Sequence, residues 1–200
     1  MNLSHLIIFT KNAELGKVKT RLAKDVGDES ALEIYQALVE HTEQVTRPVL
    51  AQKKCYYSDF IVNSDCFKDE YYEKCIQKGE DLGERMYNAA KASSGEWANK
   101  IIIIGSDCYD INSGIIEEAF KSLDSHDFVI GPAEDGGYYL IGMTELQPEI
   151  FLHKVWSTEN VFLDTLLDIQ KLNKTHYLLP TLSDVDTIED LPKNLKRLLD

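Results

Sequence analysis

A cluster of cations near the start of the chain is the first group of residues that could do chemistry. The segment 9–22, FTKNAELGKVKTRL, contains Lys11, Lys17, Lys19 and Arg21. Ammonium and guanidinium groups at this spacing suit a phosphate or pyrophosphate, above all at the carboxyl end of a parallel strand, where open α/β sheets bind ligands. The segment lacks the P-loop and dinucleotide-binding patterns, so it predicts neither an ATPase nor a nicotinamide enzyme. A solvated basic surface is the alternative interpretation.

The charge of the whole chain makes this cluster unusual. The 200 residues include 21 Lys and Arg against 34 Asp and Glu, a net charge of −13. This balance argues against a protein that binds nucleic acid or a membrane surface, because both need a basic footprint. Residues 1–24 carry five basic side chains and one acidic one, a net +4, so the rest of the chain carries −17. A cationic cluster in an acidic chain favours a functional interpretation.

The second candidate is Asp107, which lies just beyond the apolar run 101–105, after Ser106. A carboxylate just beyond a central strand, near a phosphate-binding loop, can hold Mg²⁺ or Mn²⁺ against the phosphates of a nucleotide. Asp110 could assist it. The alternative is that Asp107 caps the helix expected after Asn112.

The third candidate is the segment 130–142, IGPAEDGGYYLIG. Its paired glycines, Gly136 and Gly137, allow a ligand to approach the backbone closely, while Glu134 and Asp135 offer acceptors for hydroxyl groups or an attacking group. The same letters also predict a hairpin turn, which does not exclude a site.

The fourth candidate is the pair Asp184 and Asp186, which lie one residue apart on the same side of an extended backbone. They could complete a metal site. Taken alone, the pattern fits equally the N-terminus of a helix that starts at Thr187, where carboxylates are favoured by the helix dipole.

Histidine and cysteine side chains give little support for other chemistry. The five histidines are scattered, and none forms a nucleophile motif with a cysteine or serine. The four cysteines lack C-x-x-C spacing, so we expect free thiols rather than a zinc ribbon or a dithiol redox site.

The elements that must position these candidates alternate between strands and helices along the chain. The expected strands are 3–10, an exposed strand at 55–61, a strand from Lys100 that is covered on both faces, 128–131, 137–143 and 177–179. The expected helices are 28–46 with cap chemistry from Asp-Glu-Ser, a helix from 81 to the breaker at 93–95, one capped at 112 or 113 and ending at 123, one from 157 or 158 to about 172, and one from 187 onward.

This alternation predicts one layered α/β domain over residues 1–200, with a mainly parallel sheet. The longest apolar runs are much shorter than the roughly 20 residues that a membrane span needs, and the first fifteen residues lack the pattern of a signal peptide. We therefore expect a cytoplasmic protein without a membrane span.

Six motifs in this order resemble one known family. They are FTKxxxxGKVKTRLA at 9–23, GEDLGERM at 79–86, GSDC at 105–108, GPAEDGGYYLIG at 131–142, WST at 156–158 and DVDTxEDL at 184–191. Together they are similar to the small, uncharacterised glycosyltransferase-A-like proteins of the nucleotide-diphospho-sugar transferase superfamily, which are related to the molybdenum-cofactor and phospholactate nucleotidyltransferases. The likeness runs from about residue 5 to 195.

The resemblance implies a three-layer, Rossmann-like GT-A fold with a mixed, mainly parallel central sheet. It also implies that Asp107 and Asp186 bind Mg²⁺ or Mn²⁺ and that Lys19 and Arg21, with Asp107, take part in catalysis. The nucleotide or its phosphates would contact Lys11, Gly16, Lys17, Lys19, Arg21 and Gln77. An acceptor would face Glu134, Asp135, Gly136, Gly137 and Tyr138.

Two positions depart from the family pattern. Ala13 stands where the first loop usually has proline, and Tyr109 stands where proline usually follows SDC. Each change loosens a turn without removing a charged group.

These observations predict a metal-dependent transferase that uses a nucleotide donor, either a nucleoside triphosphate or a nucleotide sugar, with an unknown acceptor. The DVDT motif and the short chain favour nucleotidyl transfer, whereas the family resemblance favours sugar transfer. The alternatives are a catalytically silent nucleotide-binding sensor or assembly protein and an acidic interaction protein.

Overall fold

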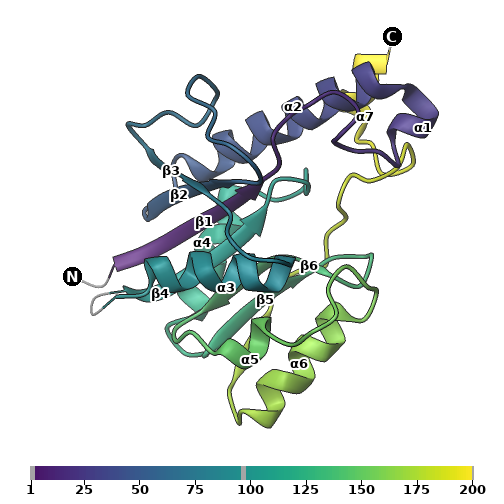
Figure 1. The fold of residues 1–200 in the computed structure, drawn as a ribbon. Helices are drawn as coiled ribbons and strands as arrows, with labels where there is room; N and C mark the ends of the chain where they lie inside the picture. Colours follow the sequence, from purple (N-terminus) through teal and green to yellow (C-terminus); the bar gives the residue numbers. More distant parts are fainter. Residues whose placement is uncertain (1–2, 96–97, 200) are drawn as a thin grey trace.

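A seven-stranded mixed sheet forms the centre of the computed structural model, which describes residues 3–95 and 98–199 (Figure 1). The strand order is β3-β2-β1-β4-β6-β5-β7. The strands are β1 (Leu3–Thr10), β2 (Gln52–Tyr57), β3 (Tyr72–Ile76), β4 (Ala98–Gly105), β5 (Phe128–Pro132), β6 (Tyr138–Met143) and β7 (His176–Leu178). Only β6 runs antiparallel to its neighbours, β4 and β5, among these strands. The expected three-layer α/β class with a mainly parallel sheet is therefore confirmed.

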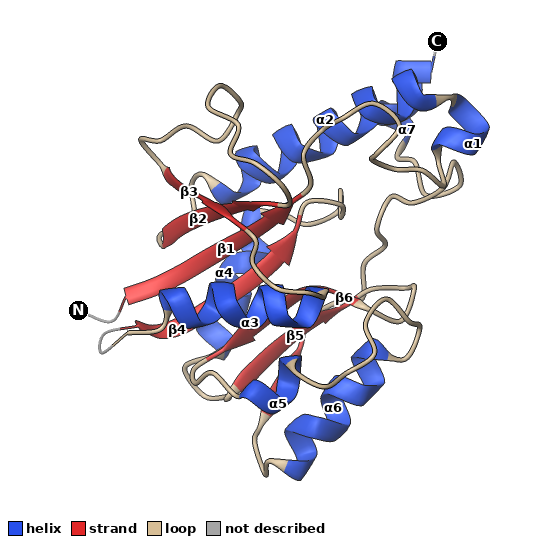
Figure 2. Cartoon of the chain, viewed as in Figure 1, coloured by secondary structure: helices blue, strands red, loops and turns tan. Residues whose placement is uncertain are grey.

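The helices lie on both faces of this sheet (Figure 2). They are α1 (Ala23–Val26), α2 (Asp28–Thr46), α3 (Leu82–Ser93), α4 (Ser113–Ser122), α5 (Pro148–Phe151), α6 (Val161–Lys171) and α7 (Lys193–Lys196), followed by a 3₁₀ turn at Arg197–Leu199. Among the described residues, no helix is long and apolar enough to span a membrane.

The central strands divide their side chains between two hydrophobic clusters because successive residues of a strand point to opposite faces. Leu6 and Ile8 of β1 pack in the cluster covered by α4, whereas Ile7 and Phe9 pack in the cluster covered by α3, α5 and α6. β4 is buried in the same two-sided way, as its unbroken apolar run predicts. These two strands therefore place their carboxyl ends, Thr10 and Gly105, at one rigid edge.

Most expected elements appear where the sequence places them. β1 and α2 have the expected bounds, the side chain of Asp81 caps α3, and the side chain of Asn112 caps α4. The cap of α2 differs from the expectation: its cap residue is Gly27 and makes no side-chain hydrogen bond, while Asp28 and Glu29 lie in the first turn. The four cysteines are free, as expected.

The interpretation of 55–61 as an exposed strand was wrong. The strand is β2, which ends at Tyr57 and pairs with β1 on one side and β3 on the other. Its last three residues are buried because Cys55 and Tyr57 pack in the hydrophobic cluster on one face of the sheet and Tyr56 packs in the cluster on the other. The sequence analysis contained no expectation for β3.

The helix expected from 157 or 158 begins later, at Val161. Ser157 adopts a positive φ of 62°, which an α-helix does not allow, so 157–160 form the loop before the helix. Within this helix, Val161, Thr165 and Ile169 are buried, whereas Leu163 and Leu167 are more than half exposed.

The helix expected from Thr187 is also absent at that position. The segment 187–191 is irregular, and α7 begins only after Pro192, its cap residue. Proline disfavours the helical conformation in the residue that precedes it, so the periodic leucines do not extend a helix through this point. Leu191 and Leu195 nevertheless face inward and pack against Leu22, Ile34 and Leu38.

Candidate active site at the carboxyl ends of the strands

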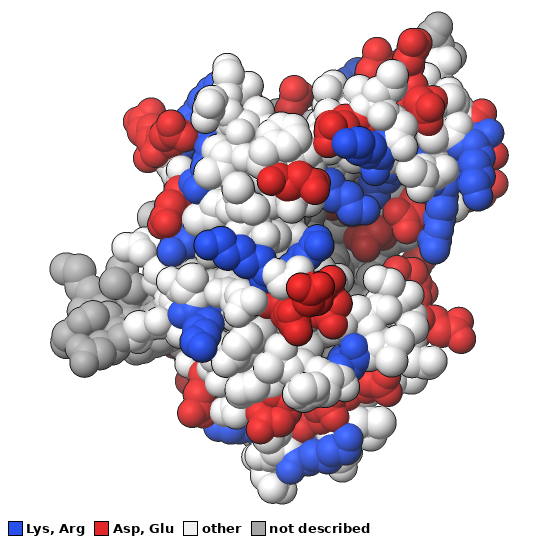
Figure 3. All heavy atoms as spheres, in the orientation of Figure 1, with Lys and Arg blue, Asp and Glu red and all other residues white. Residues whose placement is uncertain are grey.

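A cleft of about 930 Å³ opens where the carboxyl ends of β1 and β4 meet the turn between β5 and β6, the loop before α6 and the C-terminal segment. Figure 3 shows a recess there, between the part of the molecule with α1, α2 and α7 and the part with α3 and α6, with both acidic and basic side chains at its rim. Ligands of open α/β sheets bind at such an edge, so the topology marks this cleft as the candidate site.

The centre of the cleft is an ammonium group held between two carboxylates. Lys19 Nζ lies 3.0 Å from Asp107 Oδ2 and 3.2 Å from Asp186 Oδ1. The Lys19 side chain is only 4% exposed, whereas both carboxylates are about one-third exposed to the cleft. Lys19 also adopts a positive φ of 47°, an uncommon conformation for a residue with a side chain. The fold thus strains the backbone to aim this ammonium at the two aspartates.

The two aspartates reach this point from distant parts of the sequence. Asp107 follows β4, and its carbonyl oxygen accepts a hydrogen bond of 3.0 Å from the backbone N–H of Val185. That bond fixes the C-terminal segment against the strand end and brings Asp186 to the ammonium. The carboxylate of Asp190 then accepts hydrogen bonds from the backbone N–H groups of Asp186 and Thr187, which holds the turn closed.

Burial and charge oppose each other at this centre. Burial disfavours the charged form of Lys19, but the carboxylates of Asp107 and Asp186 outweigh it and raise the pKa of the ammonium. Burial, reinforced by the charge of Asp107, raises the pKa of the neighbouring Asp184 to about 7. The cleft therefore gathers three acidic side chains around one buried cation.

A buried tyrosine joins the two strand ends behind the charged centre. The hydroxyl of Tyr35, on α2, accepts a hydrogen bond of 2.8 Å from the backbone N–H of Lys11 and lies 3.0 Å from Thr10 Oγ1 and 3.3 Å from Ser106 Oγ. Burial raises the pKa of this hydroxyl. The sequence analysis missed Tyr35, since one tyrosine on the buried face of a helix is indistinguishable from a core residue.

The predicted phosphate-binding residues are only partly brought together. Lys11, Lys17, Lys19, Arg21 and Gln77 line the cleft, whereas Gly16 does not. Lys17 pairs with Glu14, and Arg21, whose side chain is 73% exposed, lies 3.5 Å from Asp186 Oδ2.

Gln77 has a structural contact of its own. Its side-chain amide donates to the carbonyl oxygens of Thr10 and Tyr56, so it fastens the ends of β1 and β2 together. This amide is thereby engaged by the protein at the wall of the cleft.

The predicted acceptor residues also divide. Asp135, Gly137 and Tyr138 line the cleft, while Glu134 and Gly136 do not. Gly136 has a φ of +88°, and a Cβ there would lie 2.0 Å from the carbonyl oxygen of Glu159, so this glycine serves the close contact of two loops. The hydroxyl of Tyr138 is buried, which leaves its ring to face the cleft. The hairpin expected here is present as β5 and β6.

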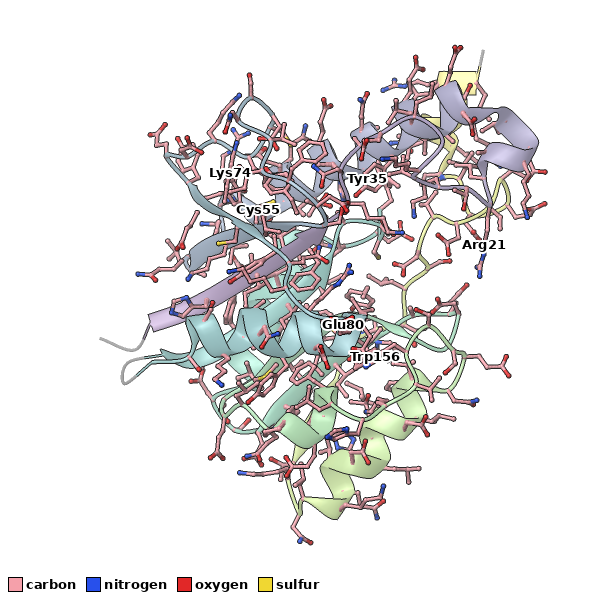
Figure 4. All side chains as sticks on the ribbon, viewed as in Figure 1. Arg21, Tyr35, Cys55, Lys74, Glu80 and Trp156 are labelled. Carbon is pink, nitrogen blue, oxygen red and sulfur yellow. The ribbon has the colours of Figure 1, made fainter. Side chains whose placement is uncertain are left out.

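The opposite wall of the cleft was not anticipated by the sequence analysis. It contains Leu82, Arg85 and Met86 of α3 together with Trp156. Figure 4 shows Trp156 near the N-terminal end of α3, across the recess from Arg21. These residues belong to the motifs GEDLGERM and WST, whose sequences alone indicate no role.

The departure at Tyr109 from the family pattern has a visible consequence. The Tyr109 ring stacks on His41 with 4.4 Å between the ring centroids, and its hydroxyl contacts the side chain of Asn194. These contacts tie the SDC loop to α2 and to α7. The turn that proline would stiffen is therefore held by packing instead.

The donor set fits a divalent cation bound jointly with phosphates. Asp107 and Asp186 offer carboxylate oxygens to one point, and hard oxygen ligands are those that Mg²⁺ and Mn²⁺ prefer. Among residues 3–95 and 98–199, no group of three or more acidic, histidine or cysteine side chains is arranged to hold a metal by itself. Mg²⁺ commonly takes one or two carboxylates and completes its shell with substrate phosphates and water.

Comparison with protein families gives one match. The family model described as an uncharacterised protein conserved in bacteria (DUF2064) matches residues 41–158, which include Arg85, Asp107 and Trp156. None of the curated proteins matches this sequence.

Solved structures with the same fold are numerous. A proposed nucleotide-diphospho-sugar transferase from Desulfovibrio desulfuricans G20 is 30% identical, with a TM-score of 0.86 over 94% of this chain and 84% of that one. CMP:2-keto-3-deoxy-manno-octonic acid synthetase, solved in complex with CTP, is 11% identical, with a TM-score of 0.62 and 98% of each chain covered.

A third structure, 4-diphosphocytidyl-2C-methyl-D-erythritol synthase from Anaerococcus prevotii DSM 20548, is 8% identical, with a TM-score of 0.59 over 99% of this chain and 95% of that one. The GT-A-like, nucleotidyltransferase-type fold expected from the sequence motifs is thereby confirmed.

Proposed function

Because this chain belongs to the DUF2064 family of bacterial proteins and has the fold of nucleotide-dependent transferases, we propose that it transfers a nucleotidyl group from a nucleoside triphosphate to an acceptor. One observation carries the proposal. Two aspartates from distant parts of the chain converge on a single cation beside a basic loop. This combination suits a nucleoside triphosphate, because cationic side chains can bind its phosphates and carboxylates can bind its metal ion.

The proposed reaction is an in-line displacement at phosphorus. A nucleophilic oxygen of the acceptor forms a bond to the α-phosphorus of the donor, the bond from that phosphorus to the bridging oxygen breaks, and pyrophosphate leaves. Mg²⁺ or Mn²⁺, when bound, neutralises charge on the phosphate oxygens. Asp107 and Asp186 would hold this cation.

The cations of the first loop would act on the donor itself. The side chain of Arg21 is more exposed than that of Lys19, and its guanidinium can bind phosphate oxygens in a bidentate way. Lys19 is buried beside Asp107 and Asp186, so its positive charge would lie near the transferred group.

Similarity to two cytidylyl-transferring enzymes favours nucleotidyl transfer and makes CTP the first donor to test. Sugar transfer from a nucleoside-diphosphate sugar is the second candidate. It is favoured by the 30% identity to the proposed nucleotide-diphospho-sugar transferase. The two reactions release different products, pyrophosphate and a nucleoside diphosphate.

A panel of donors tests the proposal. Thermal unfolding would be followed with nucleoside triphosphates and with nucleotide sugars, each with and without Mn²⁺. A ligand at 100 times its Kd adds about 2.7 kcal/mol of stability. For a chain of this size that corresponds to a rise in Tm of roughly 5 to 10 °C. We expect the rise with a triphosphate, CTP first, and only with the metal present.

Substitution at the metal site separates catalysis from binding. With a bacterial metabolite extract as the source of acceptor, we expect pyrophosphate release by the wild type and its loss in Asp107→Asn. Asp110→Asn is the matched control, because Asp110 is exposed in the same loop and does not line the cleft.

Three results would redirect the proposal. Stabilisation by nucleotide sugars alone would select sugar transfer. Metal-dependent binding without turnover of any donor would support a nucleotide-binding sensor. An unchanged Tm across the whole panel would favour an acidic interaction protein.

A further inference from the structure

The segment 79–86, GEDLGERM, has a role that the proposed transfer reaction does not explain. Two of its three acidic side chains, those of Asp81 and Glu84, bind backbone N–H groups at the start of α3. Asp81 Oδ1 accepts a hydrogen bond of 2.8 Å from the backbone N–H of Glu84, and Glu84 Oε2 accepts one of 2.9 Å from the backbone N–H of Glu80. These carboxylates therefore cap the loop and helix instead of pairing with the cation next to them.

That cation, Arg85, is half-buried and lines the cleft. Its Nε donates to the carbonyl oxygen of Gly79 at 3.2 Å, which orients the guanidinium without neutralising its charge. Gly79 allows this contact because its φ is +146°, and a Cβ there would lie 2.7 Å from the backbone nitrogen of Arg85. The motif thus builds an oriented guanidinium whose terminal nitrogens form no ion pair with a carboxylate of residues 3–95 or 98–199.

Within the part of the chain that the structure describes, burial without an ion pair distinguishes Arg85 from the other cations that line the cleft, since Lys11, which is also unpaired, is exposed. Lys17, Lys19 and Arg21 each form an ion pair. Exposed cations need no partner because water solvates them. In the described parts of the chain, Arg85 and Lys53 are the half-buried lysine and arginine side chains without an ion pair, and Lys53 lines a different groove. Because a partly buried, unpaired charge is unfavourable, an anionic ligand that pairs with this guanidinium in the cleft would be stabilised there.

An apolar wall stands beside this guanidinium. The Nε1 of Trp156 donates to the carbonyl oxygen of Phe151 at 3.1 Å, which fixes the indole. The helix approaches the indole so closely that a Cβ on Gly83 would lie 2.0 Å from Nε1. Leu82 and Met86 extend the apolar surface from the same face of α3.

We propose that Arg85 and Trp156 form an acceptor subsite for a carboxylate or phosphate group carried on a ring or another apolar body. The acid group would pair with the terminal nitrogens of Arg85, and the body would lie against Trp156, Leu82 and Met86. The assignment to the acceptor rests on the proposed function, in which the donor phosphates lie with Lys19 and Arg21. Figure 4 places Arg21 and Trp156 on opposite sides of the recess.

The fluorescence of Trp156 offers a direct test of binding. The chain has two tryptophans, so Trp97→Phe makes Trp156 the single reporter. In this background, phenyl phosphate and benzoate would be titrated as anionic ring probes, with benzyl alcohol as the neutral ring and inorganic phosphate as the anion without a ring. We expect saturable changes with the two anionic rings, and affinities at least about tenfold weaker for the other two probes.

Variants identify the contact. Arg85→Gln is expected to weaken the binding of phenyl phosphate and benzoate by about tenfold or more, and Arg85→Lys to restore part of it. Lys53→Gln is the matched control, since it removes the other unpaired half-buried cation from a different groove, and it should leave both affinities unchanged.

A parallel measurement keeps this subsite separate from the donor site. The stabilisation by CTP with Mn²⁺ should be the same in Arg85→Gln as in the wild type. If Arg85→Gln instead abolishes that stabilisation, Arg85 binds the donor and the acceptor subsite is overturned.

Two further results decide the remaining cases. Absence of saturable binding of either anionic ring, or equal binding of inorganic phosphate, also overturns the subsite. Binding of phenyl phosphate through Arg85 in a protein that ignores every nucleotide would sustain the subsite and remove the proposed function.

Discussion

At the residue scale, the most informative atom is the ammonium nitrogen of Lys19. It lies within 3.2 Å of carboxylate oxygens from Asp107 and Asp186, which are the two proposed metal ligands. A divalent cation bound by both aspartates would compete for the same oxygens. We therefore infer that metal binding weakens the hold on Lys19 and frees its ammonium for donor phosphates.

Replacing Lys19 by methionine tests this competition. Lys19→Met should bind Mn²⁺ several-fold more tightly than the wild type when no nucleotide is present, because the carboxylates lose their internal cation. Without metal, the variant should be less stable than the wild type by about 1 to 3 kcal/mol. The cost is smaller than for a fully buried ion pair because water partly solvates both carboxylates. Electron paramagnetic resonance of free Mn²⁺ and urea unfolding measure the two effects.

Lys24→Met serves as the control for this experiment, since Lys24 is exposed in the neighbouring α1 and should change neither quantity. Weaker Mn²⁺ binding by Lys19→Met would show that the ammonium assists the metal rather than competing with it.

The sequence predicted some site residues because their signal is local. Asp107 follows an uninterrupted apolar strand, and Lys19 belongs to a cationic cluster in an acidic chain. The places of Arg85 and Trp156 in the site were not predicted, because they depend on which other residues these side chains contact. Whether a guanidinium is paired, and whether an indole lies against a glycine of another element, is decided by tertiary contacts that spacing does not encode.

At the element scale, the helices and strands with the clearest hydrophobic periodicity or cap residues were the ones that the sequence predicted correctly. β4, α2 and α3 were located because their patterns are long or capped. β3 was missed because its five residues, YEKCI, lie at the edge of the sheet and alternate weakly. The final helix was placed too early because the spacing of its leucines outweighed Pro192 in the interpretation, whereas in the chain proline decides where the helix begins.

The contact between α3 and Trp156 depends on the missing side chain of Gly83. In Gly83→Ala, the new methyl group would lie 2.0 Å from Trp156 Nε1 and 2.1 Å from the carbonyl oxygen of Phe151. We expect the free energy of unfolding to fall by about 1 to 3 kcal/mol, although alanine has a better helix propensity than glycine. Urea unfolding gives the stability, and Trp156 emission reports the displaced indole.

Gly95→Ala is the matched control, because a Cβ at Gly95 meets nothing within 4 Å. Its stability should remain within about 0.5 kcal/mol of the wild type. Equal stability of the two alanine variants would mean that α3 moves freely away from Trp156.

The strands β5 and β7 are joined by a carboxylate whose charge depends on pH. The backbone N–H and hydroxyl of Thr175 donate to Asp127 Oδ2 at 2.8 and 2.7 Å, and these bonds lower the pKa of Asp127. A carboxyl whose pKa is lower in the folded state stabilises the fold above its unfolded pKa, near 3.9. That contribution disappears as the pH falls through the lower, folded pKa.

The stability difference between the wild type and Asp127→Asn should therefore be largest above about pH 5 and shrink as the pH falls towards 2. Urea unfolding across this range measures it. Glu145→Gln is a useful comparison, because it removes only the exposed partner of Lys174 and leaves the bonds between Asp127 and Thr175 in place. A pH-independent difference for Asp127→Asn would contradict the assignment.

At the scale of the whole molecule, the site joins the beginning of the chain to its end. Leu22 and α2 pack with Val185, Leu191 and Leu195 in a hydrophobic cluster that is separate from the two clusters on the sheet faces. Packing of Val185 in this small cluster places the adjacent Asp186 next to Lys19. Formation of the charged centre is therefore expected to depend on the packing of residues that do not touch it.

Leu195→Ala tests this dependence. Leu195 is buried in the small cluster, and its truncation is expected to cost about 2 to 4 kcal/mol locally. Hydrogen exchange at the Val185 amide, which bonds to the Asp107 carbonyl, should accelerate, while the amides of β4 keep their protection. Mn²⁺ affinity should fall in parallel.

Leu178→Ala provides the contrast, because Leu178 is 44% exposed at the edge of the sheet. It should leave both the exchange of Val185 and the affinity for Mn²⁺ near their wild-type values. If Leu195→Ala behaved in the same way, the C-terminal segment would be held by its polar contacts alone.

The position of Asp186 also sets when the protein becomes competent during its synthesis. All seven strands have left the ribosome once Leu178 has emerged, so a nascent chain can complete its sheet with Lys19 and Asp107 in place but one carboxylate missing. The proposed site for metal and nucleotide is then completed only after the strands, once Asp186 has also emerged. A chain that ended directly after β7 would contain Lys19 and Asp107 but lack Asp186, so we expect it to lack the proposed site.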